Sequence, residues 1–279
     1  MKLPDFEYRA PSSLPEAVET LAALGSDAKL LAGGQSLLPA MRYRLSQPGV
    51  LLDLGRVAEL RLAGDALRTG RIGAMSTHAQ FAHNDCPSPL GRLLAEHARQ
   101  IAFPAVRTRG TVGGSVVHAD PAGDWPLLFL ALDAKVELHG QRGTRSEALS
   151  DFIAGPMQTG IALDEILTAV LLDAPARDLT HWGRSKLMHR AGEYAVSSAV
   201  AVRRADGAWS CWIGAIESGP ASMAACAEML AATPRPTSQA LLACAVEDAR
   251  RACPELGQAA IHRHAINLAR AITQALELT

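Results

Sequence analysis

Two short glycine loops, about eighty residues apart, constrain this chain more than any other feature. The first, Ala32-Gly33-Gly34-Gln35-Ser36, follows a short apolar run that is typical of a buried strand. The second, Thr111-Val112-Gly113-Gly114-Ser115, interrupts the helical periodicity around it. Consecutive residues without a Cβ let successive backbone N–H groups turn toward one anion. Each loop can therefore form a cradle for a phosphate group.

The sequence around the loops narrows the kind of nucleotide site. Neither loop matches GxGxxG or GxxxxGK[ST], which excludes a Rossmann dinucleotide motif and a Walker phosphate loop. Taken singly, a Gly-Gly pair is more often only a tight turn. Taken together, one loop could hold phosphate and the other ribose, because the turn-rich acidic segment 118–124 follows the second loop.

Composition excludes several classes of partner and location. The formal net charge is -1, so the chain has no basic field for nucleic acid or an anionic membrane surface. The five cysteines contain no CxxC pair, so we expect reduced thiols and neither a zinc nor an iron–sulfur site. The start of the sequence lacks a signal-peptide core, and no long apolar window could span a bilayer. We therefore expect a cytoplasmic protein without membrane insertion.

Hydrophobic periodicity predicts alternating helices and strands. A capping box at Ser13-Leu14-Pro15-Glu16 begins an amphipathic helix that ends at Gly25, and a second helix is predicted from Pro89 to Ile101. The alternating positions from Leu60 to Gly73 indicate a small antiparallel hairpin. Asp206-Gly207 is a strong two-residue hairpin signal between two alternating runs.

The two loops also carry a resemblance to a known family. Ala32-Gly33-Gly34-Gln35-Ser36-Leu37-Leu38-Pro39 and Arg107-Thr108-Arg109-Gly110-Thr111-Val112-Gly113-Gly114-Ser115 are similar to the two FAD-binding motifs of molybdenum hydroxylase flavoprotein subunits. This is the family of the aerobic carbon monoxide dehydrogenase medium subunit and the xanthine dehydrogenase FAD domain. The likeness covers nearly the whole chain, although residues 231–258 follow no pattern of the family.

The resemblance implies an α+β fold with three parts. These are a two-part FAD-binding domain of the vanillyl-alcohol-oxidase (PCMH) type and a small C-terminal α/β domain with a three-stranded antiparallel sheet and helices. We expect the first FAD-binding subdomain at residues 1–57, the second at 58–176 and the C-terminal flavoprotein domain at 177–279. The polar, proline-bearing stretch 173–180 independently indicates the second boundary.

The resemblance also implies the cofactor site. The two glycine loops would wrap the FAD pyrophosphate, Asp124 would bind a ribose hydroxyl, and Lys186 and Tyr194 would lie beside the flavin ring. The expected FAD-binding residues are Ala32, Gly33, Gly34, Gln35, Ser36, Leu37, Thr77, Ile101, Thr111, Val112, Gly113, Gly114, Ser115, Ala119, Asp120, Gly123, Asp124, Leu167, Lys186 and Tyr194. No residue matches a covalent flavin attachment, so we expect non-covalent FAD, with no catalytic side chain and no metal.

Three of these assignments have plain structural alternatives. Asp124 is equally plausible as the N-cap of the helix that follows it. Lys186, taken alone, is typical of a surface lysine. Tyr194 could be an aromatic residue packed at a domain seam. The scattered histidines are more typical of structural or solvated positions than of metal ligands.

The function implied by the resemblance is that of an FAD-binding electron-transfer subunit of a molybdenum hydroxylase. It would accept electrons from [2Fe-2S] clusters of a small subunit and pass them to an external acceptor. Molybdopterin would lie in a large subunit, and the complex would be a dimer of heterotrimers, a heterohexamer. The chain would thus be an oxidoreductase component that is not active on substrate alone. The alternatives are a stand-alone vanillyl-alcohol-oxidase-type flavin oxidoreductase and a flavin-free assembly scaffold.

Overall fold

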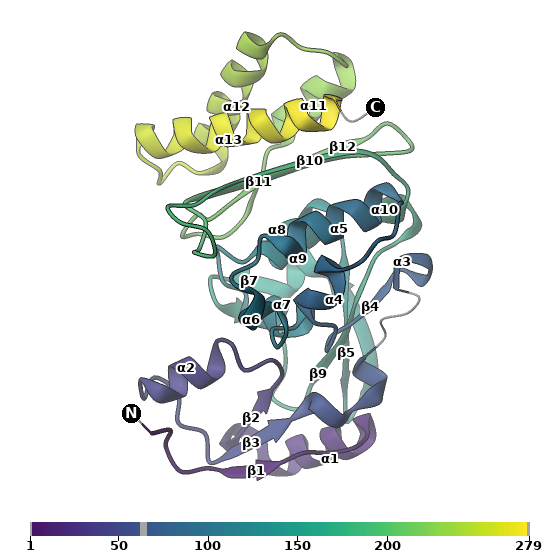
Figure 1. Cartoon of the computed structure of the whole chain (residues 1–279), viewed down its shortest axis with the longest axis vertical. Coiled ribbons are helices and arrows are strands. Elements are labelled where there is room, and N and C mark those ends of the chain that lie inside the picture. The colour runs from purple at the N-terminus through teal and green to yellow at the C-terminus, as the bar shows by residue number, and fades with distance from the viewer. Residues whose placement is uncertain (1, 62–65, 278–279) are drawn as a thin grey trace.

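Three groups of helices and strands follow one another along the long axis of the molecule (Figure 1), and the chain buries three hydrophobic clusters. The computed structural model describes residues 2–61 and 66–277. The N-terminal elements lie at one end of the long axis, and the last three helices lie at the other. None of the helices described is long and apolar enough to cross a membrane.

The N-terminal part is a small parallel sheet covered by one helix. Its strand order is β1–β3–β2, with bounds Glu7–Arg9, Val50–Asp53 and Ala28–Leu31. Helix α1 (Leu14–Leu24) begins at the predicted Ser13 cap, whose hydroxyl accepts a hydrogen bond from the Glu16 N–H at 3.4 Å. The predicted capping box is wrong in its second half, because the Glu16 carboxylate accepts from the Ser12 N–H at 2.8 Å rather than from the Ser13 N–H. Its apolar stripe, which includes Val18 and Leu21, joins the cluster beneath the sheet. The first glycine loop leaves β2 and enters α2 (Leu37–Arg42).

The middle part pairs an antiparallel sheet with a layer of helices. The sheet order is β4–β9–β5–β6, with bounds Arg71–Gly73, Ile166–Leu171, Lys135–Gly140 and Gly143–Ala148. The helices are α3 (Ala66–Thr69), α4 (His78–Ala82), α5 (Pro89–Arg99), α6 (Pro104–Arg107), α7 (Val112–His118), α8 (Asp124–Ala131), α9 (Leu149–Phe152) and α10 (Ala174–Arg177). A two-stranded ribbon, β7 (Ile153–Gly155) and β8 (Gln158–Thr159), completes this part.

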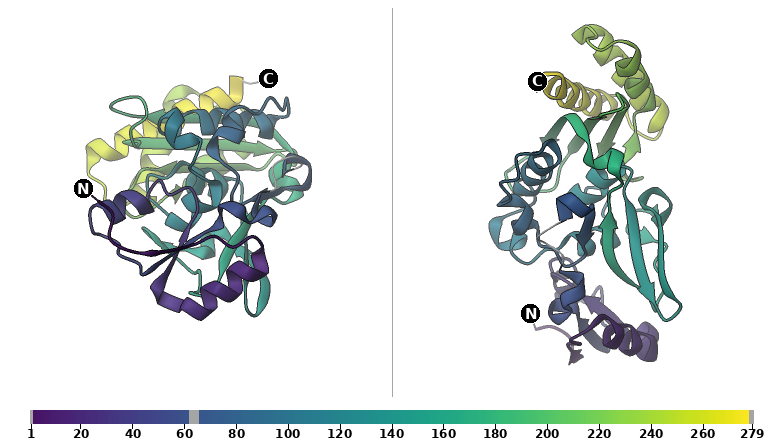
Figure 2. Two further views of the ribbon diagram at one scale, coloured as in Figure 1. Left: turned by 60° about the horizontal axis from the view of Figure 1, so that its bottom comes forward. Right: turned by 90° about the vertical axis from the view of Figure 1, so that its right-hand side faces the viewer.

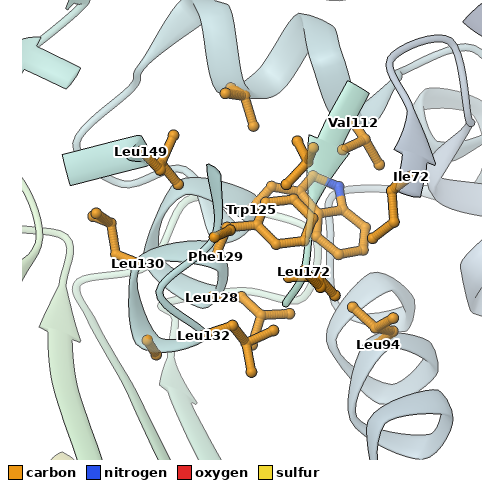
Figure 3. Packing of buried hydrophobic residues seen from close by; sticks show 14 of the residues in the cluster. Ile72, Leu94, Val112, Trp125, Leu128, Phe129, Leu130, Leu132, Leu149 and Leu172 are labelled. Carbon is orange, nitrogen blue, oxygen red and sulfur yellow. The ribbon is translucent and has the colours of Figure 1, made fainter. Parts of the chain in front are cut away.

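Trp125 lies at the centre of the middle cluster (Figure 3). Its ring is fully buried and stacks on Phe129, with the ring centroids 5.2 Å apart and an interplanar angle of 14°. Leucines from α5 and α8 surround the pair. Helix α8 is therefore fixed along its length by packing, and with it the position of its first residue, Asp124.

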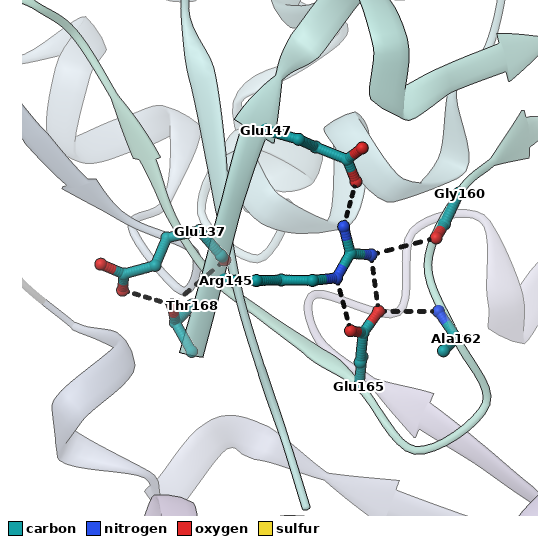
Figure 4. Close-up of polar contacts among 7 residues, drawn as sticks. All are labelled: Glu137, Arg145, Glu147, Gly160, Ala162, Glu165 and Thr168. Carbon is teal, nitrogen blue, oxygen red and sulfur yellow. Dashed lines mark hydrogen bonds and ion pairs between the residues drawn. The ribbon is translucent and has the colours of Figure 1, made fainter. Parts of the chain in front are cut away.

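A polar network stiffens the exposed side of the middle sheet (Figure 4). The Arg145 guanidinium donates to both carboxylate oxygens of Glu165, at 2.6 and 2.8 Å, and to Glu147 at 2.6 Å. The Ala162 N–H donates to the same Glu165 carboxylate at 2.9 Å. This bidentate pair ties β6 to the loop that leads into β9.

The C-terminal part is an antiparallel sheet between two helix layers. Its strands are β10 (Leu179–Leu187), β11 (Ser197–Arg204), β12 (Trp209–Gly214) and β13 (Ala221–Ser222), in that order. Helices α11 (Ala224–Ala232), α12 (Ser238–Ala252) and α13 (Gln258–Glu277) cover one face, and α5 and α8 cover the other (Figure 2). The sheet therefore joins helices α5 and α8 of the middle part to the C-terminal helices.

The fold confirms some sequence predictions and corrects others. The hairpin at Asp206-Gly207 forms as predicted, with Gly207 at φ 89°. The C-terminal sheet has four strands rather than the expected three, because the chain turns back at Gly219, at φ 108°, and adds β13 beside β12. The hairpin predicted for residues 60–73 is wrong: residues 66–69 are helical and β4 pairs with the distant β9. Part of that segment, residues 62–65, lies outside the described residues.

Candidate cofactor site

The structure brings the two glycine loops into direct contact. A Cβ built on Gly33 would lie 2.2 Å from the carbonyl oxygen of Arg109 and 2.7 Å from the Cα of Gly110. Both neighbours are backbone atoms, so neither can rotate away. The next residue, Gly34, has φ 71°, a left-handed conformation that L side chains rarely adopt. The first loop therefore needs glycine at position 33 for contact and at position 34 for conformation.

The first loop presents a row of unused hydrogen-bond donors. The backbone N–H groups of Gly33, Gly34, Gln35 and Ser36 donate no hydrogen bond within residues 2–61 and 66–277. The Ser36 side chain makes no capping bond to α2, and the Gln35 side chain donates to the Gly33 carbonyl at 3.0 Å. Such successive free N–H groups are the donor set that binds phosphate oxygens.

In the second loop, the N–H groups of residues 112–115 already donate hydrogen bonds within the described chain. The Val112 N–H donates to the Ser76 carbonyl at 2.9 Å, and the Gly113 N–H donates to the Ala74 carbonyl at 2.8 Å. The Gly114 N–H donates to the Thr111 hydroxyl at 3.1 Å, which caps α7. The two loops are therefore not equivalent. The first loop has free N–H groups for an anion, whereas the second loop supports the first by direct backbone contact.

A buried histidine connects the second loop to α8. The N–H of His78 donates to the Gly110 carbonyl at 3.0 Å, and its Nδ1 accepts from the Trp125 indole at 2.9 Å. Burial, followed by the charge of Arg107, lowers the pKa of His78 to about 4. The ring is therefore neutral near pH 7 and keeps its lone pair toward Trp125. Thr77, just before it, forms a capping box with Gln80 and a β-bridge with Thr111.

Asp124 and Lys186 form a buried ion pair. The Lys186 ammonium lies 2.8 Å from Asp124 Oδ2 and also donates to the Gln100 carbonyl at 3.1 Å. The two side chains are 2% and 11% exposed, so Lys186 is not a surface lysine. Burial raises the pKa of Asp124, and the charge of Lys186 opposes that rise. The N-cap of α8 is Gly123, so the capping alternative for Asp124 is wrong.

Two buried residues beside this pair were not expected from the sequence as site residues. His97 Nε2 lies 2.8 Å from the Asp124 carbonyl oxygen, and burial holds the pKa of His97 well below its ordinary value. Arg184 is 7% exposed, and its Nε and Nη1 have no hydrogen-bond partner among the described residues. Its position two residues before Lys186 on β10 was the available signal, because alternate strand residues share a face.

Exposed aromatic residues lie next to this polar cluster. Tyr194 is 66% exposed, so it is not packed inside a domain seam. Partial burial and the neighbouring carboxylate of Asp120 raise the pKa of Tyr194. Phe103 is 57% exposed, and its ring packs on the backbone of Gly192 in the same loop as Tyr194. Sequence reasoning missed Phe103.

The remaining predicted residues have mainly structural positions. Leu167 is 4% exposed and pairs with Leu138 across β9 and β5, within the middle cluster. Ile101 packs at the edge of that cluster. Ala119 ends α7 in a left-handed conformation, with φ 48°, and Leu37 is the first residue of α2. A direct cofactor contact for these apolar residues stays a prediction.

Other parts of the described chain offer less for a cofactor. A cavity of about 430 Å³ lies at the junction of α5, β10 and α13, where its lining includes Cys86, Glu96 and Trp182. It lacks a glycine loop and a row of free donors. Within the described residues, no group of three or more His, Cys, Asp or Glu side chains could hold a metal ion.

Comparisons with known proteins agree with this geometry. Residues 4–174 match the family model described as the FAD binding domain in molybdopterin dehydrogenase. The nicotine 6-hydroxylase medium subunit of Paenarthrobacter nicotinovorans is 41% identical over 202 residues, which cover 72% of this chain and 70% of that protein. The carbon monoxide dehydrogenase medium chain of Hydrogenophaga pseudoflava is 40% identical over 204 residues, covering 73% and 71%.

Solved structures share the fold over the whole chain. A chain of quinoline 2-oxidoreductase from Pseudomonas putida 86 superposes with a TM-score of 0.87 at 31% identity, covering 99% of each chain. A chain of carbon monoxide dehydrogenase from Oligotropha carboxidovorans gives a TM-score of 0.87 at 29% identity, covering 100% of each.

Proposed function

Because the chain belongs to the family of FAD-binding domains of molybdopterin dehydrogenases, we propose that it is the FAD-carrying electron-transfer subunit of a molybdenum hydroxylase. It accepts electrons from [2Fe-2S] clusters of a small partner subunit and passes them to an external acceptor. The observation that carries the proposal is the row of four free N–H groups at residues 33–36, in a loop whose backbone contacts the second glycine motif at Arg109 and Gly110.

The residues present fit the chemistry of FAD. The free donors of the first loop suit a pyrophosphate. Asp124 Oδ1 accepts no hydrogen bond from any described residue, so it is available to a ribose hydroxyl. No covalent attachment is needed, and we infer non-covalent binding through the full set of twenty residues named from the sequence. When bound, FAD supplies the redox chemistry that protein side chains lack.

The residues of this chain position charge around the cofactor. Lys186 holds the Asp124 carboxylate in place by the 2.8 Å ion pair. Arg184 also lies near this carboxylate, so two buried cations, Lys186 and Arg184, act on Asp124, and the nearby Asp120 carboxylate partly offsets them. Fixed cations in a buried site favour negative charge on a bound group. Tyr194 would shield the flavin ring from water on the exposed side.

The subunit arrangement and domain division belong to the same proposal. Several relatives are named as medium subunits or medium chains, which supports a complex with a molybdopterin-binding large subunit and a small subunit. We infer a dimer of heterotrimers in the cytoplasm. We also infer a vanillyl-alcohol-oxidase (PCMH) type division at residues 1–57 and 58–176, with a C-terminal domain at 177–279. The separate N-terminal and C-terminal clusters support that division.

An FAD titration of the purified chain tests the proposal. The absorption spectrum is recorded before and after incubation with FAD, and the protein is then precipitated with acid. We expect a yellow protein that releases FAD into the supernatant and that turns over no substrate by itself. A protein that takes up no FAD would favour the scaffold. Turnover of substrate by the isolated chain would favour the stand-alone oxidoreductase.

A further inference from the structure

The turn that follows α5 adopts an unusual backbone conformation. Helix α5 ends at Arg99, and the chain then turns through residues 100–103 before α6 begins at Pro104. Ala102 in this turn has φ 43°, in the left-handed region that favours glycine. A non-glycine residue keeps such a conformation only where its surroundings hold it there.

Two cations hold this turn by its carbonyl oxygens. Arg107 Nη1 donates to the carbonyl oxygen of Ile101 at 2.9 Å and to that of Ala102 at 2.8 Å. The Lys186 ammonium donates to the preceding carbonyl, of Gln100, at 3.1 Å. Three successive carbonyls therefore accept from two buried or half-buried cations. Cations at the C-terminal end of a helix are also favoured by its dipole.

The conformation of this turn sets the position of Phe103. A Cβ built on Gly192 would lie 2.5 Å from the Phe103 ring, and Gly192 itself has φ 85°. The ring thus rests directly on the backbone of the loop that carries Tyr194. Ile101, on the other side of the turn, packs against the middle cluster. A shift of the turn would therefore move both Ile101, at the edge of the middle cluster, and the Phe103 ring that rests on the loop of Tyr194.

We propose that Arg107 is a positioning residue for FAD binding. By holding the carbonyls of Ile101 and Ala102, it fixes the left-handed turn that places Ile101 and Phe103 beside the cofactor. Arg107 acts through the turn and does not itself touch FAD. This role rests on the proposed function, because it presupposes that the site binds FAD.

A rescue experiment separates this role from a general loss of charge or of stability. The full-length wild-type chain and its variants are titrated with FAD, and flavin fluorescence and visible absorption are recorded with Tm. For Arg107→Ala we expect about a tenfold rise in Kd, which corresponds to about 1.4 kcal/mol, and an altered visible spectrum of bound flavin. Adding Ala102→Gly to that variant relieves the backbone penalty, so Kd should return to within about threefold of the wild-type value.

Two further variants control the comparison. Arg92→Ala removes the same charge from an exposed position on α5 and should leave Kd unchanged. Arg107→Lys keeps the charge but cannot reproduce the guanidinium geometry, so an intermediate Kd is expected.

The outcomes distinguish failure of the inference from failure of the function. A wild-type chain that binds no FAD overturns the proposed function and, with it, this role. A wild-type chain that binds FAD while Arg107→Ala keeps the wild-type Kd and spectrum overturns the role of Arg107 alone. The role of Arg107 is also overturned if Arg107→Ala weakens FAD binding and the added Ala102→Gly does not restore the Kd. If Arg107→Ala does not fold, Arg107→Lys with and without Ala102→Gly decides in the same way.

Discussion

Replacing Gly33 with alanine tests the contact between the two glycine loops. The added Cβ would lie 2.2 Å from the Arg109 carbonyl oxygen, whereas ordinary van der Waals contact begins near 3.4 Å. Because the opposing atoms are backbone, the loops must separate by about 1.2 Å. Overpacking of this kind costs about 1–3 kcal/mol of folding free energy. At about 2–4 °C per kcal/mol, Tm should fall by roughly 2–12 °C.

The effect of Gly33→Ala on FAD binding should exceed its effect on stability. The first loop carries the free N–H groups of residues 33–36, and a displacement of about 1.2 Å breaks at least one hydrogen bond to a charged phosphate oxygen. One such bond is worth about 1.5–3 kcal/mol, so Kd should rise roughly 10- to 150-fold. Differential scanning fluorimetry gives Tm, and fluorescence titration with FAD gives Kd.

Two glycines elsewhere provide matched controls for Gly33→Ala. A Cβ on Gly257 meets nothing within 4 Å, so Gly257→Ala should change neither Tm nor Kd. A Cβ on Gly183 would lie 1.8 Å from the Ala271 carbonyl oxygen, between β10 and α13. Gly183→Ala should therefore lower Tm, but it should weaken FAD binding much less than Gly33→Ala does. Wild-type FAD affinity in Gly33→Ala would refute the reasoning, as would equal losses of affinity in Gly33→Ala and Gly183→Ala.

Three more predictions concern ionisable groups. Lys186→Met leaves Asp124 buried without its partner and should lower the free energy of unfolding by about 3–5 kcal/mol in chemical denaturation. Adding Asp124→Asn to that variant should make the loss of stability smaller. A double variant whose loss of stability equals the sum of the two single losses would contradict this. Glu165→Gln breaks the bidentate pair with Arg145. Because the Arg145 side chain is 40% exposed, the free energy of unfolding in urea should fall by only about 1 kcal/mol. An unchanged free energy of unfolding would show that solvent screens the pair. The pKa of His78 is lowered in the folded chain, so on acidification the unfolded chain takes up a proton before the folded chain does. The free energy of unfolding should therefore fall as the pH drops from 6.5 toward about 4. His78→Gln should make this fall with pH smaller, as measured by unfolding at a series of pH values.

The sequence by itself determined the local features of this protein. The Ser13 cap, the turn at Asp206-Gly207 and the glycine loops depend on residues adjacent in the chain, whose backbone preferences act before any tertiary contact forms. The family motifs at residues 32–39 and 107–115 identified the class of cofactor, which the match over residues 4–174 supports. Local chemistry of this kind can be read without knowing the fold.

Only the tertiary structure decided how these features act together. The contact of Gly33 with Gly110, the pairing of Lys186 with Asp124 and the pairing of β4 with β9 each join residues far apart in the chain. The same is true of the hydrogen-bond donors. The two loops have similar sequences, yet carbonyl oxygens and the Thr111 hydroxyl accept hydrogen bonds from residues 112–115 of the second loop, whereas the N–H groups of residues 33–36 donate to no described residue. Hydrogen-bond partners and burial are settled by which distant segments meet, and a sequence motif alone does not specify that competition.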